Sequence, residues 1–159
     1  MANLREITAY KTILMKMFCT DEIIGRNVLN DGETYTGKEL MYRKVFPYPY
    51  VPEITEDAQT FVCFEVNVPL VYRYVTKQLE IKVYVITHRS LMRLPDSGGM
   101  RIDVISAAVD KLLNGARDFG INRVELISVY GFTPIEGYYG RVITYQVDDV
   151  NVNPCEGWE

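Results

Sequence analysis

The stretches TFVCFEVNV (residues 60–68) and QLEIKVYVIT (residues 78–87) decide the fold, because both alternate between two sets of side chains. One face of each stretch is wholly apolar: Val62, Phe64, Val66 and Val68 in the first, and Leu79, Ile81, Val83 and Val85 in the second. This period of two is typical of half-buried antiparallel strands. The link PLVYRYVTK (residues 69–77) can continue the first strand as a bent extension, with the break at Pro69.

Helices are predicted on both sides of these strands in the sequence. Apolar residues recur at helical spacing between Leu4 and Phe18, and Asp21 is placed to start a second, short helix. A central amphipathic helix is predicted over residues 101–113 and ends at Asn114-Gly115. Residues 122–132 and 138–152 read as two more strands joined by a hairpin. The chain is therefore predicted to form one α+β domain over residues 1–159, with an antiparallel sheet packed against the N-terminal and central helices.

Residues 39–58 read as an extended arm, because Pro47, Pro49 and Pro52 remove backbone donors and exclude a helix. The arm is rich in apolar and aromatic side chains, too many for a freely solvated segment. We interpret them as candidates for an interface with a neighbouring subunit: Val45, Phe46, Tyr48, Tyr50 and Val51.

Residues 88–100 read as a basic loop that begins at the single histidine, His88. A catalytic histidine needs an orienting partner and a substrate pocket, and the sequence indicates neither, so a solvated or locally hydrogen-bonded side chain is favoured. Arg89, Arg93 and Arg101 suit contact with an acidic protein surface as readily as with nucleic acid.

An enzymatic alternative rests on Glu65 together with Glu80 and Lys82 on the next strand. Carboxylates that hold Mg²⁺ beside a lysine that positions water are the chemistry of metal-dependent nucleases. The same residue types on paired strands also make an ordinary cross-strand ion pair, and a motif this short has a high false-positive rate.

Composition narrows the classes of function. A net charge of −4 disfavours a broad electrostatic grip on nucleic acid. Cys19, Cys63 and Cys155 are too far apart for a zinc motif or a disulfide framework, which favours a reducing compartment. No signal-like or membrane-spanning apolar run is present. We expect no metal, no cofactor, no membrane attachment, no sequence-specific nucleic-acid binding and assembly in the cytoplasm.

A resemblance spans nearly the whole chain. Its features are the helix closing on TDEII, the strap MYRKVFPYPYVPE, the strand running into VITHRSLM, GGMRIDVISAAVDKLLNG leading into FGINRVELISV, and YYGRVITYQVDDVN. In this order of elements the chain resembles small phage virion proteins of the neck region, most of all the tail terminator (tail completion) proteins.

The resemblance implies an α+β subunit without catalytic residues that forms a hexameric ring in the virion. Such a ring caps the tail tube protein on one face and offers its other face to the head-connector protein. The twelve tyrosines of the chain agree with extensive interfaces. A head-tail connector of the stopper or adaptor kind, and a monomeric binding module such as a phage-encoded inhibitor, are the alternatives that also need no active site.

Overall fold

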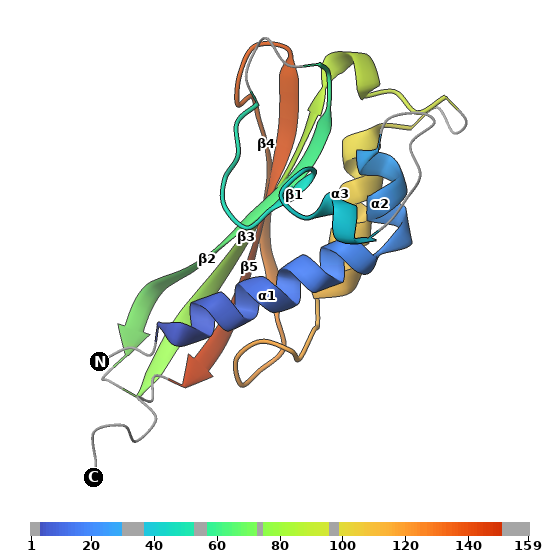
Figure 1. Ribbon diagram of the computed structural model, residues 1–159. Coiled ribbons are helices and arrows are strands. Elements are labelled where there is room, and N and C mark those ends of the chain that lie inside the picture. Colours follow the sequence, from blue (N-terminus) through green and yellow to red (C-terminus); the bar gives the residue numbers. More distant parts are fainter. Residues whose placement is uncertain (1–3, 30–36, 53–56, 73–74, 96–98, 151–159) are drawn as a thin grey trace.

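A computed structural model describes residues 4–29, 37–52, 57–72, 75–95 and 99–150 (Figure 1). The helices are α1 (Arg5–Thr20), α2 (Glu22–Val28) and α3 (Arg101–Leu113), with short 3-10 helices η1 (Gly37–Leu40) and η2 (Arg89–Leu91). The strands are β1 (Val45–Phe46), β2 (Thr60–Tyr72), β3 (Thr76–His88), β4 (Glu125–Phe132) and β5 (Tyr138–Val150). The predicted α+β architecture is confirmed.

The five strands form one sheet in the order β1-β2-β3-β5-β4. The pairs among β2, β3, β5 and β4 are antiparallel, as predicted, but β1 runs parallel to β2. The sheet is therefore mixed and not purely antiparallel. The reason lies in the arm: residues 47–59 supply the crossover of a dozen or more residues that a parallel pair requires.

The three helices bury the apolar faces of the strands on one side of the sheet. Phe18 of α1 meets Phe64 of β2 edge to face, with ring centroids 5.6 Å apart. Asp21 begins α2 by accepting a hydrogen bond from the backbone N–H of Ile24 at 2.9 Å, as expected of an N-cap aspartate. The predicted strand face and the α3 face meet in this core: Val62, Phe64, Val66, Leu79, Ile81, Val83, Val85, Ile105 and Val109 are all buried there.

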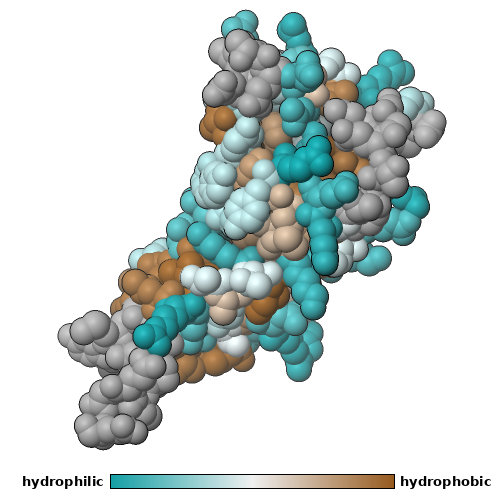
Figure 2. Space-filling model, in the orientation of Figure 1, coloured by the Kyte–Doolittle hydropathy of each residue, from teal (hydrophilic) through white to brown (hydrophobic). Residues whose placement is uncertain are grey.

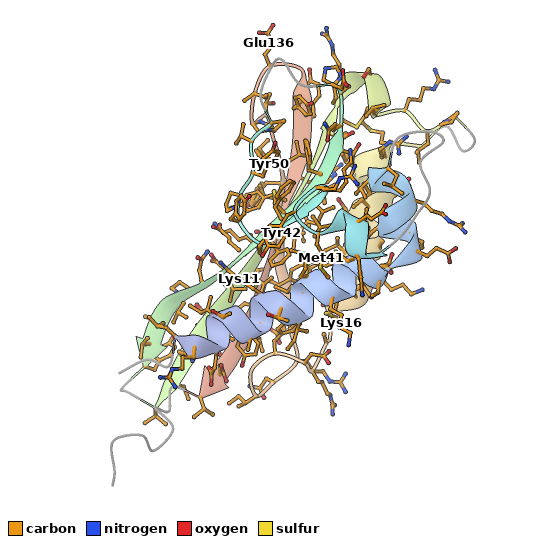
Figure 3. The ribbon with its side chains drawn as sticks, viewed as in Figure 1. Lys11, Lys16, Met41, Tyr42, Tyr50 and Glu136 are labelled. Carbon is orange, nitrogen blue, oxygen red and sulfur yellow. The ribbon has the colours of Figure 1, made fainter. Side chains whose placement is uncertain are left out.

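A second, smaller hydrophobic cluster lies on the opposite face of the sheet. We call it the outer cluster, and its buried members are Phe46, Phe61, Cys63, Ile86 and Tyr138. The arm supplies part of it, because Phe46 stacks on Tyr50 with ring centroids 4.2 Å apart. Tyr50 lies on the segment that follows β1 (Figure 3). One end of the outer face is thus covered by the chain itself.

β2 is bent where the sequence predicted a break. Its register against β3 shifts between Asn67 and Leu70, on either side of Pro69. Beyond this irregularity β2 and β3 stay paired from Leu70 and Gln78 to the end of their hairpin (Figure 1). None of the helices in the described part of the chain combines the length and the apolar character that crossing a bilayer requires.

Candidate interaction surfaces

Strand β4 forms an open edge of the sheet and is unusually apolar for that position. Among the described residues it pairs with β5 alone. Four large side chains on it are between 37% and 69% exposed, and we call them the edge surface: Leu126, Ile127, Val129 and Tyr130. An exposed apolar edge strand carries unpaired backbone groups and invites pairing with another chain.

The end of the β2–β3 hairpin carries a second exposed apolar group, which we call the hairpin surface. Its members are between 41% and 63% exposed: Leu70, Val71, Tyr72 and Val75. In the described part of the chain β1 pairs with β2 only at Val62 and Cys63, so the far half of β2 is also an open edge. Figure 2 shows hydrophobic atoms gathered over the end of the molecule that holds this hairpin and the start of α1. The sheet therefore has two open apolar edges on opposite sides.

The arm residues proposed for a subunit interface divide into two groups. Val45 is buried in the helix-side core, while Phe46 is buried in the outer cluster and Tyr50 packs against it. Tyr48 and Val51 are each about half exposed. Of the five proposed residues, these two remain open to another molecule.

The three arginines of the basic loop also divide. Arg89 and Arg93 are exposed. Arg101 is buried, and its guanidinium donates to the carbonyl oxygens of Leu91 and Asn27, at 2.8 Å each. Arg101 thereby joins η2 and the end of α2 to the start of α3, and the charges open to a partner are those of Arg89 and Arg93.

His88 has a local structural role. Its Nδ1 accepts a hydrogen bond from the backbone N–H of Ser90 at 3.1 Å and lies 2.7 Å from the Ser90 hydroxyl, which caps η2. Its ring also meets Tyr138 edge to face at 5.0 Å. These contacts are the locally bonded arrangement that the sequence favoured over a catalytic one.

Glu65, Glu80 and Lys82 lie together on the outer face, but each has a simple partner. Glu65 is opposite Lys82 in the register and accepts a hydrogen bond from the Tyr84 hydroxyl at 2.6 Å. Lys82 Nζ lies 3.8 Å from Glu80. Burial, and then the bond to Glu65, raise the pKa of Tyr84. No group of three or more potential metal ligands occurs among the described residues.

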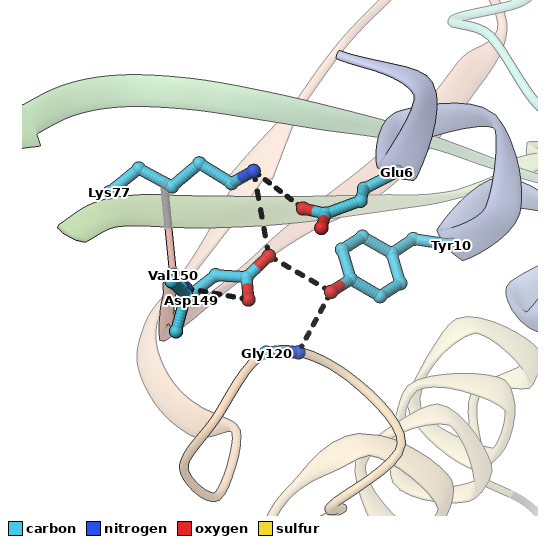
Figure 4. A network of polar contacts seen from close by, with 6 residues as sticks. All are labelled: Glu6, Tyr10, Lys77, Gly120, Asp149 and Val150. Carbon is cyan, nitrogen blue, oxygen red and sulfur yellow. Dashed lines mark hydrogen bonds and ion pairs between the residues drawn. The ribbon is translucent and has the colours of Figure 1, made fainter. Parts of the chain in front are cut away.

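A second lysine of β3 belongs to a buried polar network (Figure 4). Lys77 Nζ lies 2.5 Å from Glu6 of α1 and 3.6 Å from Asp149 of β5. Asp149 in turn accepts a hydrogen bond from the Tyr10 hydroxyl at 2.9 Å, and that hydroxyl accepts one from the backbone N–H of Gly120. Burial raises the pKa of Tyr10 to about 12 and also raises that of Glu6, where the bond to Lys77 opposes it. The network ties α1 to the sheet.

The described cysteines are not nucleophiles. Cys19 and Cys63 are buried, free thiols, and burial raises the pKa of each to about 11. Both therefore stay protonated near neutral pH, and a protonated thiol is a poor nucleophile.

The sequence reasoning missed the edge surface and the hairpin surface. The signal for the first was the nearly continuous apolar run in ELISVYGF, which resembles a strand buried on both faces. The signal for the second was the apolar run PLVY, which the sequence pattern predicted only as a bent link. Neither run reveals its exposure, because exposure depends on the strand order.

The structure is that of a small α+β protein whose sheet has two open apolar edges. The chain belongs to the YomW family, a phage-associated family whose model matches residues 13–147. No curated protein matches it.

Proposed function

We propose that this protein is a structural component of a phage neck: a tail terminator that forms a ring, caps the tail tube and joins it to the head. The observation that carries the proposal is the pair of open apolar edges on opposite sides of one sheet, the edge surface on β4 and the hairpin surface on β2. Membership of a phage-associated family supports the setting.

Two different edges favour a ring over a two-fold dimer. When one surface of a subunit contacts a different surface of the next, the contact is heterologous, and repeated heterologous contacts close into a ring when the rotation permits. Here β4 of one subunit adds to the free half of β2 of its neighbour, which joins the sheets and covers both apolar surfaces. The ring is a hexamer, as the resemblance implies.

The basic loop is the proposed contact with the tail tube protein. Arg89 and Arg93 are exposed beside η2, at the end of β3 remote from the hairpin surface. They can therefore meet an acidic rim of the tube while the sheet edges hold the ring. Tyr48 and Val51 of the arm extend the subunit contacts. The opposite face of the ring meets the head-connector protein.

The test of the ring uses two variants that each destroy one edge. Ile127→Glu places a charge on the edge surface, and Tyr72→Glu places one on the hairpin surface; Ile23→Glu, on an exposed face of α2, is the matched control. Sedimentation should show a closed oligomer for the wild type and the control, and monomers for each edge variant alone.

Mixing the two edge variants identifies the kind of contact. In a heterologous ring the intact β4 edge of one variant meets the intact hairpin edge of the other, so the mixture gives a dimer and nothing larger. If β4 instead paired with its own copy, Tyr72→Glu alone would dimerise and the mixture would add nothing, which contradicts the ring. A wild type that stays monomeric at high concentration, even with tail tubes present, also overturns it.

Electron microscopy of tail tubes tests the cap. Reversing Arg93 to glutamate should leave the ring intact and reduce the capping of tube ends, most strongly at low salt, where surface charges are least screened. Arg89→Glu should reduce capping as well. A ring that binds isolated head connectors but never tube ends would instead indicate a stopper or adaptor.

A further inference from the structure

A pocket lies at the end of the molecule where α3 begins. Its volume is about 570 Å³, and residues from η2 and the following loop, the start of α3, and the adjoining ends of β4 and β5 line it. This volume is in the range of pockets that enclose a small ligand or a few side chains, roughly 300 to 1,000 Å³. It exceeds what a single aromatic ring fills.

The lining combines apolar and aromatic surface with positive charge. Met92, Met100 and Phe132 supply flexible apolar and aromatic surface, which adapts well to an inserted ring. Arg89 and Arg141 stand in the lining, and Arg141 is bonded to Asp103 at 2.7 Å. Because Asp103 already pairs with Arg141, Arg89 supplies the positive charge of the lining that has no ion pair among the described residues, and the chemistry that fits is an aromatic side chain beside a carboxylate.

The chain itself contains such a segment outside the described residues. Residues 151–159 read NVNPCEGWE and hold the only tryptophan, Trp158, between Glu156 and Glu159. An indole ring would occupy the apolar lining, and a neighbouring carboxylate would face Arg89. Tryptophan is also among the residue types enriched at the energetic hot spots of protein interfaces.

Docking of Trp158 in the pocket of its own subunit would require the tail to be almost fully extended along the molecule. Val150 ends β5 beside Thr76, whereas Tyr139, Gly140 and Arg141 line the pocket at the other end of that strand. The ten residues of strand between Gly140 and Val150 span about 33 Å. Trp158 is eight residues beyond Val150, a reach of at most about 29 Å even when fully extended, and the chain must also reverse direction.

We infer that residues 151–159 of one subunit dock in this pocket of a neighbouring subunit, with Trp158 as the anchor. The inference rests on the self-association proposed above and adds a second link between subunits. It too is heterologous, since the tail leaves one end of the subunit and the pocket lies at the other. Each subunit would thus hold its neighbour through both a sheet edge and a tail.

The probe is a synthetic peptide of residues 151–159 with Cys155 replaced by serine. The receptor is the full chain carrying Trp158→Ala, so that the peptide contributes the only tryptophan in the mixture. Docking moves the tryptophan emission to shorter wavelength and saturates with receptor concentration. Fluorescence polarisation of a dye-labelled peptide measures the effect of replacing its tryptophan by alanine. The replacement should weaken binding by roughly thirtyfold, the size typical of an aromatic hot spot.

A steric block tests whether the pocket is the site. Gly131 lines the pocket, and an added Cβ there would meet only the Gly140 carbonyl oxygen at 3.8 Å, so Gly131→Leu fills the pocket without a backbone clash. It should weaken peptide binding by roughly tenfold or more. Ser128→Leu is the matched control, because its register places the same new side chain on the opposite face of β4.

Charge reversal gives an independent readout. Arg89→Glu should weaken the peptide more at low than at high salt, whereas Arg43→Glu, an exposed arginine outside the lining, should not. A peptide that fails to bind, or that binds the Gly131→Leu and Ser128→Leu receptors equally, overturns the inference. If rings still form in that case, the proposed function stands. If the peptide docks in the pocket and self-association is lost in Trp158→Ala but not in Ile127→Glu or Tyr72→Glu, the tail links the subunits and the proposed ring of sheet edges fails alone. A wild type that never assembles overturns both.

Discussion

Lys77 and Lys82 lie on the same strand, β3, each near carboxylates, yet they face opposite sides of the sheet. The Lys77 side chain is 1% exposed and lies between Glu6 and Asp149; that of Lys82 is 34% exposed and lies beside Glu80. Removing a charge from water is costly, so a buried lysine depends on its carboxylates, whereas a solvated lysine depends on water. Similar residue types therefore form a structural tie on one face and a weak surface pair on the other.

Lys77→Met should have the largest effect on stability. It leaves Glu6 and Asp149 close together without a cation, and breaking such a buried pair costs about 3 to 5 kcal/mol in the free energy of unfolding. Lys82→Met is the matched control and should change it by less than about 0.5 kcal/mol. Denaturant unfolding measures both. Equal losses would contradict the distinction between the two faces.

Ile81→Ala compares the two faces by removing apolar volume from the helix side. Ile81 is buried beneath the helices, so its truncation leaves a cavity and should cost about 2 to 5 kcal/mol. Glu80→Ala, one residue earlier on the outer face, should cost almost nothing by the same unfolding measurement. A larger loss for Glu80 than for Ile81 would reverse the assignment of the faces.

The pH dependence of stability should reveal the raised pKa of Glu6. Its pKa is raised in the folded state, chiefly by burial, so the folded chain binds this proton more readily than the unfolded chain does. This group therefore stabilises the fold progressively as the pH falls through its folded pKa, and that contribution is lost as the pH rises. The stability of the wild type relative to Glu6→Gln should increase on mild acidification. A constant or falling difference would contradict the shift.

The smallest expected effect concerns DNA. Incubation of plasmid with the protein and Mg²⁺ or Mn²⁺ should leave the DNA intact, since Glu65 is bonded to Tyr84 and Lys82 lies beside Glu80 as an ordinary surface pair. Cleavage that disappears in Lys82→Ala would make the outer face a nuclease site. Lys82 would then be a catalytic residue, and Lys77 would remain a structural one.

The sequence by itself determined the local elements. Period-two alternation in β2 and β3, helical spacing in α1 and α3, and the Asp21 cap are properties of neighbouring residues, and all three recur in the structure. The residues of the helix-side core were also predictable from the sequence, because a strand face that is apolar over its whole length must be covered.

Only the tertiary structure decided which surfaces stay open. Val45 and Phe46 of the arm form a parallel strand in the sheet of their own subunit. Arg101 is buried because it donates to carbonyl oxygens of Leu91 and Asn27. In each case the partners lie in other segments of the same subunit. The apolar residues of β4 stayed exposed because β4 is at the edge of the strand order. Patterns along a chain specify which residues prefer to be buried, but strand order decides which of them find cover within one subunit.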